Sequence, residues 1–136
     1  MLKALYYCHK ICKIIHRDIK PENIAINHNG EAVLIDFGVS VDTFDRKDDK
    51  LDENLGTTIL YAPEMFMDDQ KIHGERTDIW ALGITFFYLV CGQYPWREAK
   101  KLYELKEHVL LKDIDFSLIK DEGVRSLLKQ ILMKDP

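Results

Sequence analysis

Residues Ile15–Gly38 read I-H-R-D-I-K-P-E-N-I-A-I-N-H-N-G-E-A-V-L-I-D-F-G, and the rest of the chain is organised around this stretch. Its centre, His28-Asn29-Gly30, contains Asn-Gly, a strong signal for a hairpin turn because both residues tolerate positive φ. We therefore predict one strand over Ile24–Asn27 and a returning strand over Glu31–Ile35. A hairpin of this kind brings its two open ends side by side.

Three polar side chains, Asp18, Asn23 and Asp36, lie outside the predicted strands. Because the hairpin ends meet, we expect Asn23 and Asp36 to be neighbours, and their oxygens are hard ligands that suit Mg²⁺. Asp18 lies near Lys20, so the carboxylate is suited to accept a proton from a hydroxyl and the lysine to steady a transferring phosphate. A single acid of this kind is more often a turn residue that faces water.

The same string resembles the protein kinase family. His16–Asn23, Asp36-Phe37-Gly38 and Ala62-Pro63-Glu64 match the family motifs H-R-D-L-x-x-x-N, D-F-G and A-P-E in the right order. Three such motifs are very hard to obtain together by chance. The resemblance covers nearly the whole chain, and it implies a mainly α fold with a small β-hairpin, like the large, C-terminal lobe of a kinase domain.

The resemblance implies a role for each matched residue. Asp18 would orient a substrate hydroxyl and accept its proton, and Lys20 would contact the phosphoryl group that leaves ATP. Asn23 and Asp36 would hold Mg²⁺ and, through it, the nucleotide. Structural roles in the family fall to the matched residues His16, Phe37 and Gly38.

Residues Gly56–Glu64 read G-T-T-I-L-Y-A-P-E, which is similar to the G-T-x-x-Y-x-A-P-E of serine/threonine kinases. Leu60 departs from the aromatic residue that the family often has there. Thr57 matches the threonine that bonds the catalytic aspartate and its lysine, and with Lys20 it favours serine or threonine as the substrate. Glu64 matches a glutamate that pairs with an arginine beyond a final D-P, and no such arginine occurs in this sequence.

Residues Thr77–Gly92 are predicted to form the core helix, with Asp78 and Trp80 in a string similar to the family's D-x-W-x-x-G. The resemblance implies that Asp78 holds the backbone of the catalytic loop. An alternative is that Asp78 is an acid at the helix N-terminus that complements the helix dipole. Both interpretations are compatible, since the residue stands near the predicted start.

The segment 39–64 corresponds to the kinase activation segment, which switches between ordered and disordered states in the family. Val39–Leu55 is dense in acids, so we predict a solvated, flexible loop. In the family an arginine at the position of Arg17 often pairs with a phosphate on this segment. The usual phosphosite of the family falls on Glu53 in this sequence, and an acid already at that position predicts that activity depends only weakly on phosphorylation. Thr58 is the alternative phosphosite.

The remaining elements follow from periodicity and turn signals. The first helix carries the stripe Leu2, Leu5, Tyr6, His9 and Cys12. Asp121 is predicted to cap the last helix. The predicted helices are Leu2–Cys12, Ala99–Val109 and Asp121–Lys134, with a turn over Gly92–Trp96 and a loop over Asp113–Lys120.

The 136 residues suffice for one small domain, and their net charge is −4 without a basic stripe, which argues against nucleic acid as a partner. The longest apolar run, Ile79–Cys91, falls short of the roughly 20 residues that span a membrane, so no membrane partner is expected. Three cysteines are an odd number without a secretory signal, so we expect reduced thiols in an intracellular protein, cytoplasmic or nuclear.

Two alternatives stay open beside an active kinase. No G-x-G-x-x-G and no V-A-I-K-like lysine occurs in these residues. We therefore expect a partial kinase domain, 1–136, that lacks the N-terminal lobe and alone binds Mg²⁺ and ATP weakly with little activity. The first alternative is a non-catalytic short protein that uses the lobe surface for protein binding. The second is a metal site among Cys8, His9, Cys12 and His16, of which residues 8, 12 and 16 would share one helical face, although the spacing is poor for zinc.

The strings F-G-V-S and D-I-W-A-L-G-I-T-F-F-Y-L-V-C-G-Q-Y-P-W look similar to two subfamilies. These are the calcium/calmodulin-dependent kinase kinases and the liver kinase B type. Both act on other kinases, so this resemblance implies a protein substrate that is itself a kinase.

Overall fold

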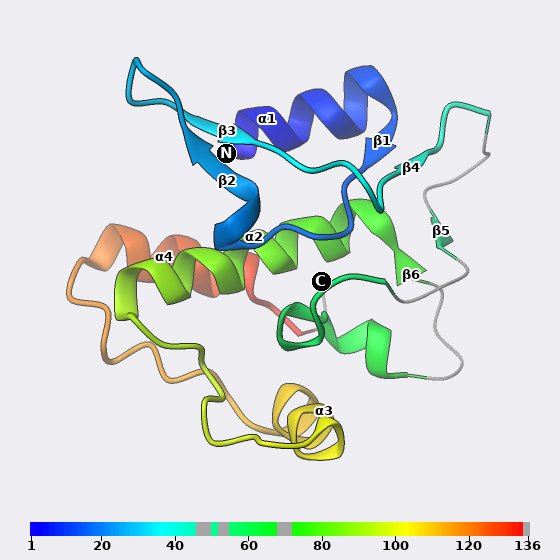
Figure 1. Cartoon of the computed structure of the whole chain (residues 1–136). Helices are drawn as coiled ribbons and strands as arrows, with labels where there is room; N and C mark the ends of the chain where they lie inside the picture. The colour runs from blue at the N-terminus through cyan, green and yellow to red at the C-terminus, as the bar shows by residue number, and fades with distance from the viewer. Residues whose placement is uncertain (46–49, 52–54, 68–71, 135–136) are drawn as a thin grey trace.

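The computed structural model describes residues 1–45, 50–51, 55–67 and 72–134, and the long helix α2 (Gly74–Cys91) runs through its centre (Figure 1). Helix α1 (Leu2–Tyr6) and a β-hairpin lie on one side of α2, and α3 (Leu102–Leu111) lies on the other. Helix α4 (Glu122–Ile131) packs against α2. The structure is therefore mainly α with small sheets, as the sequence predicts.

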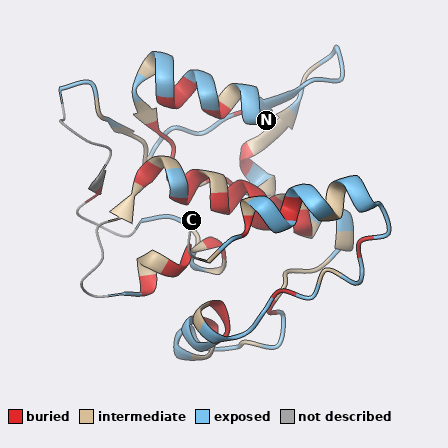
Figure 2. Cartoon of the chain, turned by 180° about the vertical axis from the view of Figure 1, so that it is seen from behind, coloured by how far each residue is buried: buried red, intermediate tan, exposed pale blue. Residues whose placement is uncertain are grey.

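Helix α2 is buried along most of its length (Figure 2), because neighbouring elements surround it. The helix begins at Gly74, three residues before the predicted start, and Gly92 ends it with a left-handed φ of 69°. The acid in its first turn is Glu75. Asp78 therefore lies in the second turn, and its prediction as an N-terminal acid that complements the dipole is wrong.

The core gathers apolar side chains from the whole described chain around α2. Helix α4 approaches α2 at Gly83, where an added Cβ would lie 2.6 Å from Cγ2 of Ile131 and 2.7 Å from Cδ2 of Leu132. This glycine allows the close packing of the two helices. The largest fully buried apolar residues are Leu5, Ile15, Ile19, Ile84, Phe87, Val109, Ile119 and Leu128.

The predicted hairpin is confirmed. Strand β2 (Ile24–Ile26) pairs antiparallel with β3 (Ala32–Leu34), with Ala25 opposite Val33. Gly30 has a φ of +79° and donates its N–H to the carbonyl of Asn27, which closes the turn. The N–H of Ile35 bonds the carbonyl of Asn23 at 2.9 Å, so the two ends of the hairpin meet.

The segment after the hairpin is more ordered than predicted at two places. Strand β4 (Val41–Asp42) pairs with β1 (Ile14–Ile15), and β5 (Lys50–Leu51) pairs with β6 (Ile72–His73). The prediction of one continuous loop is therefore wrong at these strands. Their partners come from distant parts of the sequence, so local composition did not indicate them.

The first predicted helix has the right extent, and its predicted stripe is buried at Leu5 and His9 but exposed at Leu2 and Tyr6. Helix α1 continues as a π-helical turn, Tyr7–Cys12, and ends at Lys13 with a φ of 57°. The π-helical geometry changes the periodicity. Leu2 and Tyr6 are 46% and 63% exposed, whereas Cys8 and His9 are buried.

The two last helices differ from their predictions at their ends. Helix α3 begins at Leu102 rather than residue 99, because the Glu104 carboxylate accepts the backbone N–H groups of Lys100 and Lys101 and so caps a later start. The predicted cap of α4 is confirmed, since Oδ1 of Asp121 accepts the N–H of Val124 at 2.8 Å. Helix α4 ends at Ile131, three residues before the predicted end.

Candidate active site

Asp78 of α2 holds the backbone of the loop that precedes the hairpin. Its Oδ2 accepts the N–H of His16 and its Oδ1 accepts the N–H of Arg17, both at 2.8 Å. The ring of His9 donates to the same carboxylate at 2.8 Å. Asp78 is 1% exposed, so these three donors compensate the burial of its charge. They also hold Arg17 at a left-handed φ of 69°.

Thr85 of α2 holds the same loop at a second point, further along the chain. Its hydroxyl donates to the carbonyl of Ile19 at 3.1 Å, and Ile19 is fully buried. Asp78 and Thr85 lie two turns apart on α2, so the helix supports the loop at two points. Sequence reasoning missed Thr85 and the buried partner His9, because an isolated threonine or histidine in a helix carries no signal of a contact so far along the chain.

His16 connects the loop to the end of the hairpin. Its Nε2 donates to the carbonyl of Ile35 at 3.0 Å, and its Nδ1 accepts the N–H of Asp18 at 3.3 Å. These two partners select one tautomer of the neutral ring. The Phe37 ring meets the imidazole edge-on at 4.8 Å between centroids. The buried ring of His16 therefore links the segments that carry Asp18 and Asp36.

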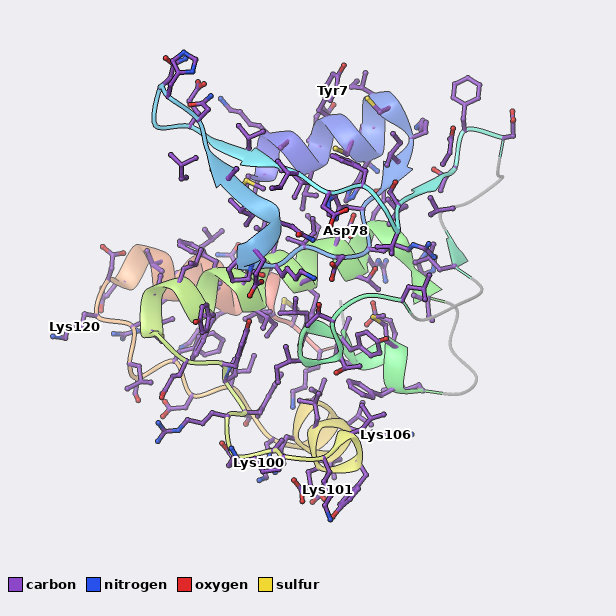
Figure 3. All side chains as sticks on the ribbon, viewed as in Figure 1. Tyr7, Asp78, Lys100, Lys101, Lys106 and Lys120 are labelled. Carbon is purple, nitrogen blue, oxygen red and sulfur yellow. The ribbon has the colours of Figure 1, made fainter. Side chains whose placement is uncertain are left out.

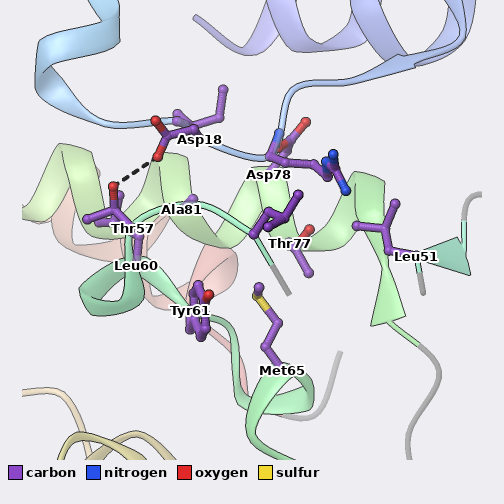
Figure 4. A pocket seen from close by; sticks show the side chains of 12 residues that line it. Asp18, Leu51, Thr57, Leu60, Tyr61, Met65, Thr77, Asp78 and Ala81 are labelled. Carbon is purple, nitrogen blue, oxygen red and sulfur yellow. Dashed lines mark hydrogen bonds between the residues drawn. The ribbon is translucent and has the colours of Figure 1, made fainter. Parts of the chain in front are cut away.

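Asp18 stands at the centre of a polar cluster. Its Oδ2 lies 2.7 Å from Nζ of Lys20, and its Oδ1 accepts the hydroxyl of Thr57 at 2.9 Å (Figure 4). Lys20 also donates to the Thr57 oxygen at 3.5 Å. The amide nitrogen of Asn23 donates to Oδ2 of Asp18 at 3.0 Å and to its backbone carbonyl at 2.8 Å. The structure thus brings Asp18, Lys20, Asn23 and Thr57 together.

Charge interactions in this cluster shift two pKa values in opposite directions. Burial acts to raise the pKa of Asp18, but hydrogen bonds from Lys20, Thr57 and Asn23 with the lysine charge hold that pKa below its usual value. The hydrogen bond to Asp18 raises the pKa of Lys20, and the carboxylates of Glu22 and Asp36 add to this effect. Both groups are therefore charged at neutral pH.

Asn23 and Asp36 present oxygens suited to a divalent cation. The amide nitrogen of Asn23 donates to Asp18, so its other amide atom, the oxygen, remains for another ligand. Asp36 is exposed and has a left-handed φ of 62°, and its Oδ1 accepts the N–H of Gly38 at 3.1 Å. Hard oxygen donors of this kind fit Mg²⁺ rather than a softer metal.

The pocket below Asp18 is a small packing gap. Figure 4 shows Leu60, Tyr61 and Met65 on one wall, with Thr77 of α2 close by. Its volume of about 20 Å³ has room for roughly one water molecule. This gap is too small for a nucleotide.

Other predicted site residues lie outside the Asp18 cluster. The Arg17 side chain donates to the carbonyl of Val39, at the start of the segment 39–64. Thr58 is exposed at the start of the 3₁₀ turn Thr58–Leu60, and Glu53 lies outside the described residues. Trp80 is buried and stacks on Trp96 at 6.4 Å.

Glu64 belongs to the 3₁₀ turn Pro63–Phe66, and burial raises the pKa of its carboxyl. A bond to its own backbone N–H and the charges of Arg76 and His73 act to lower this pKa, but burial outweighs them. Glu64 and Arg76 line a groove of about 550 Å³ with residues of α1 and α4.

The proposed arrangement of Cys8, Cys12 and His16 on one helical face is wrong, because the helix ends at Cys12 and His16 bonds Ile35 instead. In the described part of the chain, no three His, Cys, Asp or Glu side chains converge as metal ligands. Across the same residues, no helix combines the length and the apolar character needed to cross a membrane.

Comparisons with known proteins agree with these motifs. The protein kinase domain family matches residues 1–136. The chain is 38% identical over its whole length to the serine/threonine-protein kinase CHK1 of Saccharomyces cerevisiae, covering 27% of that protein. It is 34% identical to the SNF-related serine/threonine-protein kinase of Rattus norvegicus, covering all of this chain and 18% of that protein.

The third relative, Aurora kinase B of Danio rerio, is 33% identical over 98% of this chain and 39% of that protein. The chain therefore spans less than half the length of each of these relatives. All three are named as kinases, and the family match extends over every residue. The chain belongs to the protein kinase domain family.

Proposed function

We propose that the Asp18 cluster is the hydroxyl-activating half of a serine/threonine kinase site, which transfers the terminal phosphoryl group of ATP to a protein. The convergence of Lys20, Thr57 and Asn23 on one carboxylate carries this proposal. In this reading, residues 1–136 form the large lobe of a kinase domain. The family match and the serine/threonine kinase relatives support it.

Asp18 orients the substrate hydroxyl in this mechanism. The oxygen of that hydroxyl forms a bond to the terminal phosphorus, the bond from this phosphorus to the bridging oxygen of ADP breaks, and the proton passes to Asp18. A pKa below the usual value makes Asp18 a weak base. Its main contribution is therefore orientation, with the proton accepted as the oxygen–phosphorus bond forms.

Lys20 and Thr57 prepare this carboxylate and the phosphoryl site. The Lys20 ammonium, 2.7 Å from Asp18, is placed to meet the negative oxygens of the phosphoryl group. Thr57 accepts from Lys20 and donates to Asp18, so it keeps both side chains in one arrangement. The relatives named above are serine/threonine kinases, which supports serine or threonine rather than tyrosine as the substrate residue.

Asn23 and Asp36 would hold Mg²⁺, and with it the phosphates of ATP. Their oxygens are hard donors on adjoining ends of the hairpin, and the amide nitrogen of Asn23 already faces Asp18. When bound, Mg²⁺ neutralises charge on the phosphate oxygens. The protein residues orient these ligands, because His16 and the hairpin register set the position of Asp36.

The segment 39–64 would act as the activation segment. Arg17 contacts it at Val39, and Glu53 and Thr58 are its candidate regulatory positions. An acid at position 53 predicts activity that depends weakly on phosphorylation. Activity of a complete kinase that contains this chain, measured before and after phosphatase treatment, checks this prediction, and a near-total loss contradicts it.

The subfamily proposal concerns the substrate. Similarity of two strings to kinases that act on other kinases supports a kinase as the protein substrate. The relatives reported above belong to other named groups of serine/threonine kinases. We propose an intracellular location on the same grounds as before, namely three cysteines that are all free thiols.

A phosphotransfer assay tests the main proposal. We fuse the chain to the nucleotide-binding lobe of a related kinase and follow the transfer of labelled phosphate to a serine peptide. Asp18→Asn should lower kcat by about 10²- to 10⁴-fold, the contribution of a positioned proton acceptor. Lys106→Met is the control, since Lys106 lies on α3, away from α2 (Figure 3). Equal activity of Asp18→Asn and the unmodified fusion would overturn the proposal.

A second candidate function, protein binding without catalysis, is favoured by an apolar groove of about 610 Å³. Met1, Ile26, Phe86 and Leu127 are among its lining residues, from four separate segments. An apolar groove of this kind could receive an apolar segment of a partner protein. Asp18→Asn would leave such binding unchanged, so retained cellular function of that variant favours this second candidate.

A further inference from the structure

A groove beside the end of α4 shares no residue with the Asp18 cluster. It has a volume of about 500 Å³, and four of its lining side chains are apolar, those of Ile114, Phe116, Leu132 and Met133. Ile114 and Leu132 are buried in the core, whereas Met133 is 53% exposed. The groove therefore has an apolar floor that is continuous with the core and an apolar wall that faces solvent.

Lys134 places an amine at this groove. The residue lines the groove, and its Nζ donates to the backbone carbonyl of Lys112. Lys112 follows α3 and Lys134 follows α4, so this bond joins the segments after the two helices. A single uncharged acceptor therefore meets one N–H of the side chain. The other charged residues of the groove are Asp113 and Lys129.

Burial makes the ammonium form of Lys134 less favourable. Desolvation lowers the pKa of Lys134, and the Asp113 carboxylate acts to raise this pKa but does not offset the burial. Among the described residues, no carboxylate lies within ion-pair distance of this ammonium. The neutral amine is therefore more populated at Lys134 than at a fully solvated lysine.

A neutral amine beside an apolar groove is a nucleophile for an electrophile that carries an apolar tail. Two features favour acyl transfer over the other reactions of an amine. An amide carries no charge, so acylation removes the ammonium that burial disfavours, whereas the imine formed with an aldehyde keeps a nitrogen that can be protonated. An amide also keeps one N–H, which matches the single carbonyl acceptor of Lys112.

We propose that Lys134 is an acylation site, and that the apolar groove beside it holds the hydrocarbon chain of an acyl thioester. The nitrogen forms a bond to the carbonyl carbon, the bond from this carbon to sulfur breaks, and the proton of the nitrogen passes through water to the departing thiolate. The step needs no oxidant or reductant. This modification lies outside the Asp18 cluster and does not depend on the proposed kinase function.

Thioesters of N-acetylcysteamine provide the test, because their small leaving group is uncharged. The 136-residue chain is treated with the acetyl or the octanoyl thioester, and mass spectrometry of its peptides measures the initial acylation rate at each lysine. Lys120, exposed on the loop before α4, is the internal reference (Figure 3). We expect the octanoyl-to-acetyl rate ratio to be about 15- to 60-fold higher at Lys134 than at Lys120, as burial of about two or three methylene groups implies.

The acetyl thioester alone tests the burial of the amine. Its acyl group is too short to fill the groove, so its rate reports the state of the nitrogen. We expect acetylation to be faster at Lys134 than at Lys120, and also faster than at Lys129, which lines the same groove but is exposed.

Two exposed apolar residues provide matched variants. Met133→Ser removes the solvent-facing wall of the groove and should lower the octanoyl-to-acetyl ratio at Lys134, while acetylation continues. Leu111→Ser changes an apolar residue outside the groove that is 75% exposed, and it should leave this ratio unchanged. Circular dichroism verifies that both variants fold, and the comparison of Lys134 with Lys120 in the unmodified chain needs neither variant.

Three results would overturn the proposal. They are equal octanoyl-to-acetyl ratios at Lys134 and Lys120, acetylation of Lys134 that is no faster than that of Lys129, and a ratio that Met133→Ser leaves unchanged. Failure of the proposed kinase function would appear instead in the fusion assay, which uses no thioester.

Discussion

The carboxylate of Asp78 shows how one residue positions a whole loop. It receives two backbone N–H groups of the loop and the ring of His9, which is 69 positions away in the sequence. The left-handed φ of Arg17 is retained because these bonds hold the neighbouring peptides. Strain of this kind persists only where surrounding contacts over-determine the backbone.

Thr57 provides the first prediction at this scale. Replacing it with alanine removes the hydrogen bond to Asp18, and a bond to a charged group contributes about 1.5–3 kcal/mol. We expect Thr57→Ala to lower kcat in the fusion assay by about 10- to 100-fold. Thr57→Ser keeps the hydroxyl and should retain most activity. Ser126→Ala, on the exposed face of α4, is the control, and equal rates for Thr57→Ala and Ser126→Ala would contradict the role.

Glu64 provides a prediction about pH. Burial raises the pKa of the Glu64 carboxyl above its ordinary value of 4.5, so this carboxyl binds its proton more tightly in the folded state than in the unfolded state. The ionised carboxyl therefore destabilises the fold at neutral pH, and this effect is lost as pH falls through the raised pKa toward 4.5. Chemical denaturation should show Glu64→Gln to be more stable than the unmodified chain at pH 7.

The advantage of Glu64→Gln should shrink as the pH approaches 4.5, because the native carboxyl is then protonated as well. Glu107→Gln, an exposed acid on α3, serves as the control and should show no such trend. A Glu64→Gln variant that is less stable than the unmodified chain at pH 7 would show instead that Glu64 has a compensating charged partner.

Helices α2 and α4 illustrate the element scale, because their contact depends on a residue without a side chain. A Cβ on Gly83 would lie 2.6 Å from Ile131 and 2.7 Å from Leu132. Overpacking costs about 1–3 kcal/mol, and the better helix propensity of alanine offsets about 1 kcal/mol of it. We expect Gly83→Ala to lower the free energy of unfolding, measured in urea, by up to about 2 kcal/mol.

Ser126→Ala, an exposed change on α4, is the control for Gly83→Ala and should leave stability unchanged or slightly higher. Adding Leu132→Val to Gly83→Ala should recover part of the loss, because the shorter side chain relieves the contact. A Gly83→Ala variant that is more stable than the unmodified chain would contradict the close approach of the two helices.

Elements with local signals could be predicted from the sequence, and those that depend on distant partners could not. The hairpin was predictable because Asn29-Gly30 and the flanking apolar residues are adjacent. The cap of α4 was predictable from Asp121 alone. Strands β4 and β5 were not, since their partners Ile14–Ile15 and Ile72–His73 are remote. The first helix was placed correctly, but its π-helical continuation also buries Cys8, which lies outside the predicted stripe.

The same limit applies to the candidate site. The family resemblance predicted that Asp18, Lys20, Thr57 and Asn23 lie close together, and the structure brings them into contact. The resemblance also predicted that Asp78 holds the backbone of the loop, which the structure confirms. It did not reveal the contributions of His9 and Thr85, because these resemble ordinary helix residues. The stack of Tyr88 on Tyr94 was also unpredicted, since Tyr88 lies in the last turn of an apolar helix and Tyr94 in the turn that follows it.

For the whole molecule, the decisive feature is that the residues of the proposed site would contact the nucleotide from one side only. Asp18, Asn23 and Asp36 offer ligands for the hydroxyl and for Mg²⁺, and Asp36 is exposed. These 136 residues contain no G-x-G-x-x-G and no V-A-I-K-like lysine to contact the phosphates from the other side. Water then reaches the phosphates, and electrostatic contacts weaken as the effective dielectric rises.

We therefore expect the purified 136-residue chain to bind Mg²⁺ and ATP weakly and to transfer phosphate at a rate close to background. Isothermal titration calorimetry measures the binding, and labelled ATP with a serine peptide measures the transfer. The fusion to a nucleotide-binding lobe is the positive control, and its Asp18→Asn variant is the background. Robust turnover by the chain alone would mean that the described residues enclose the phosphates without a second lobe.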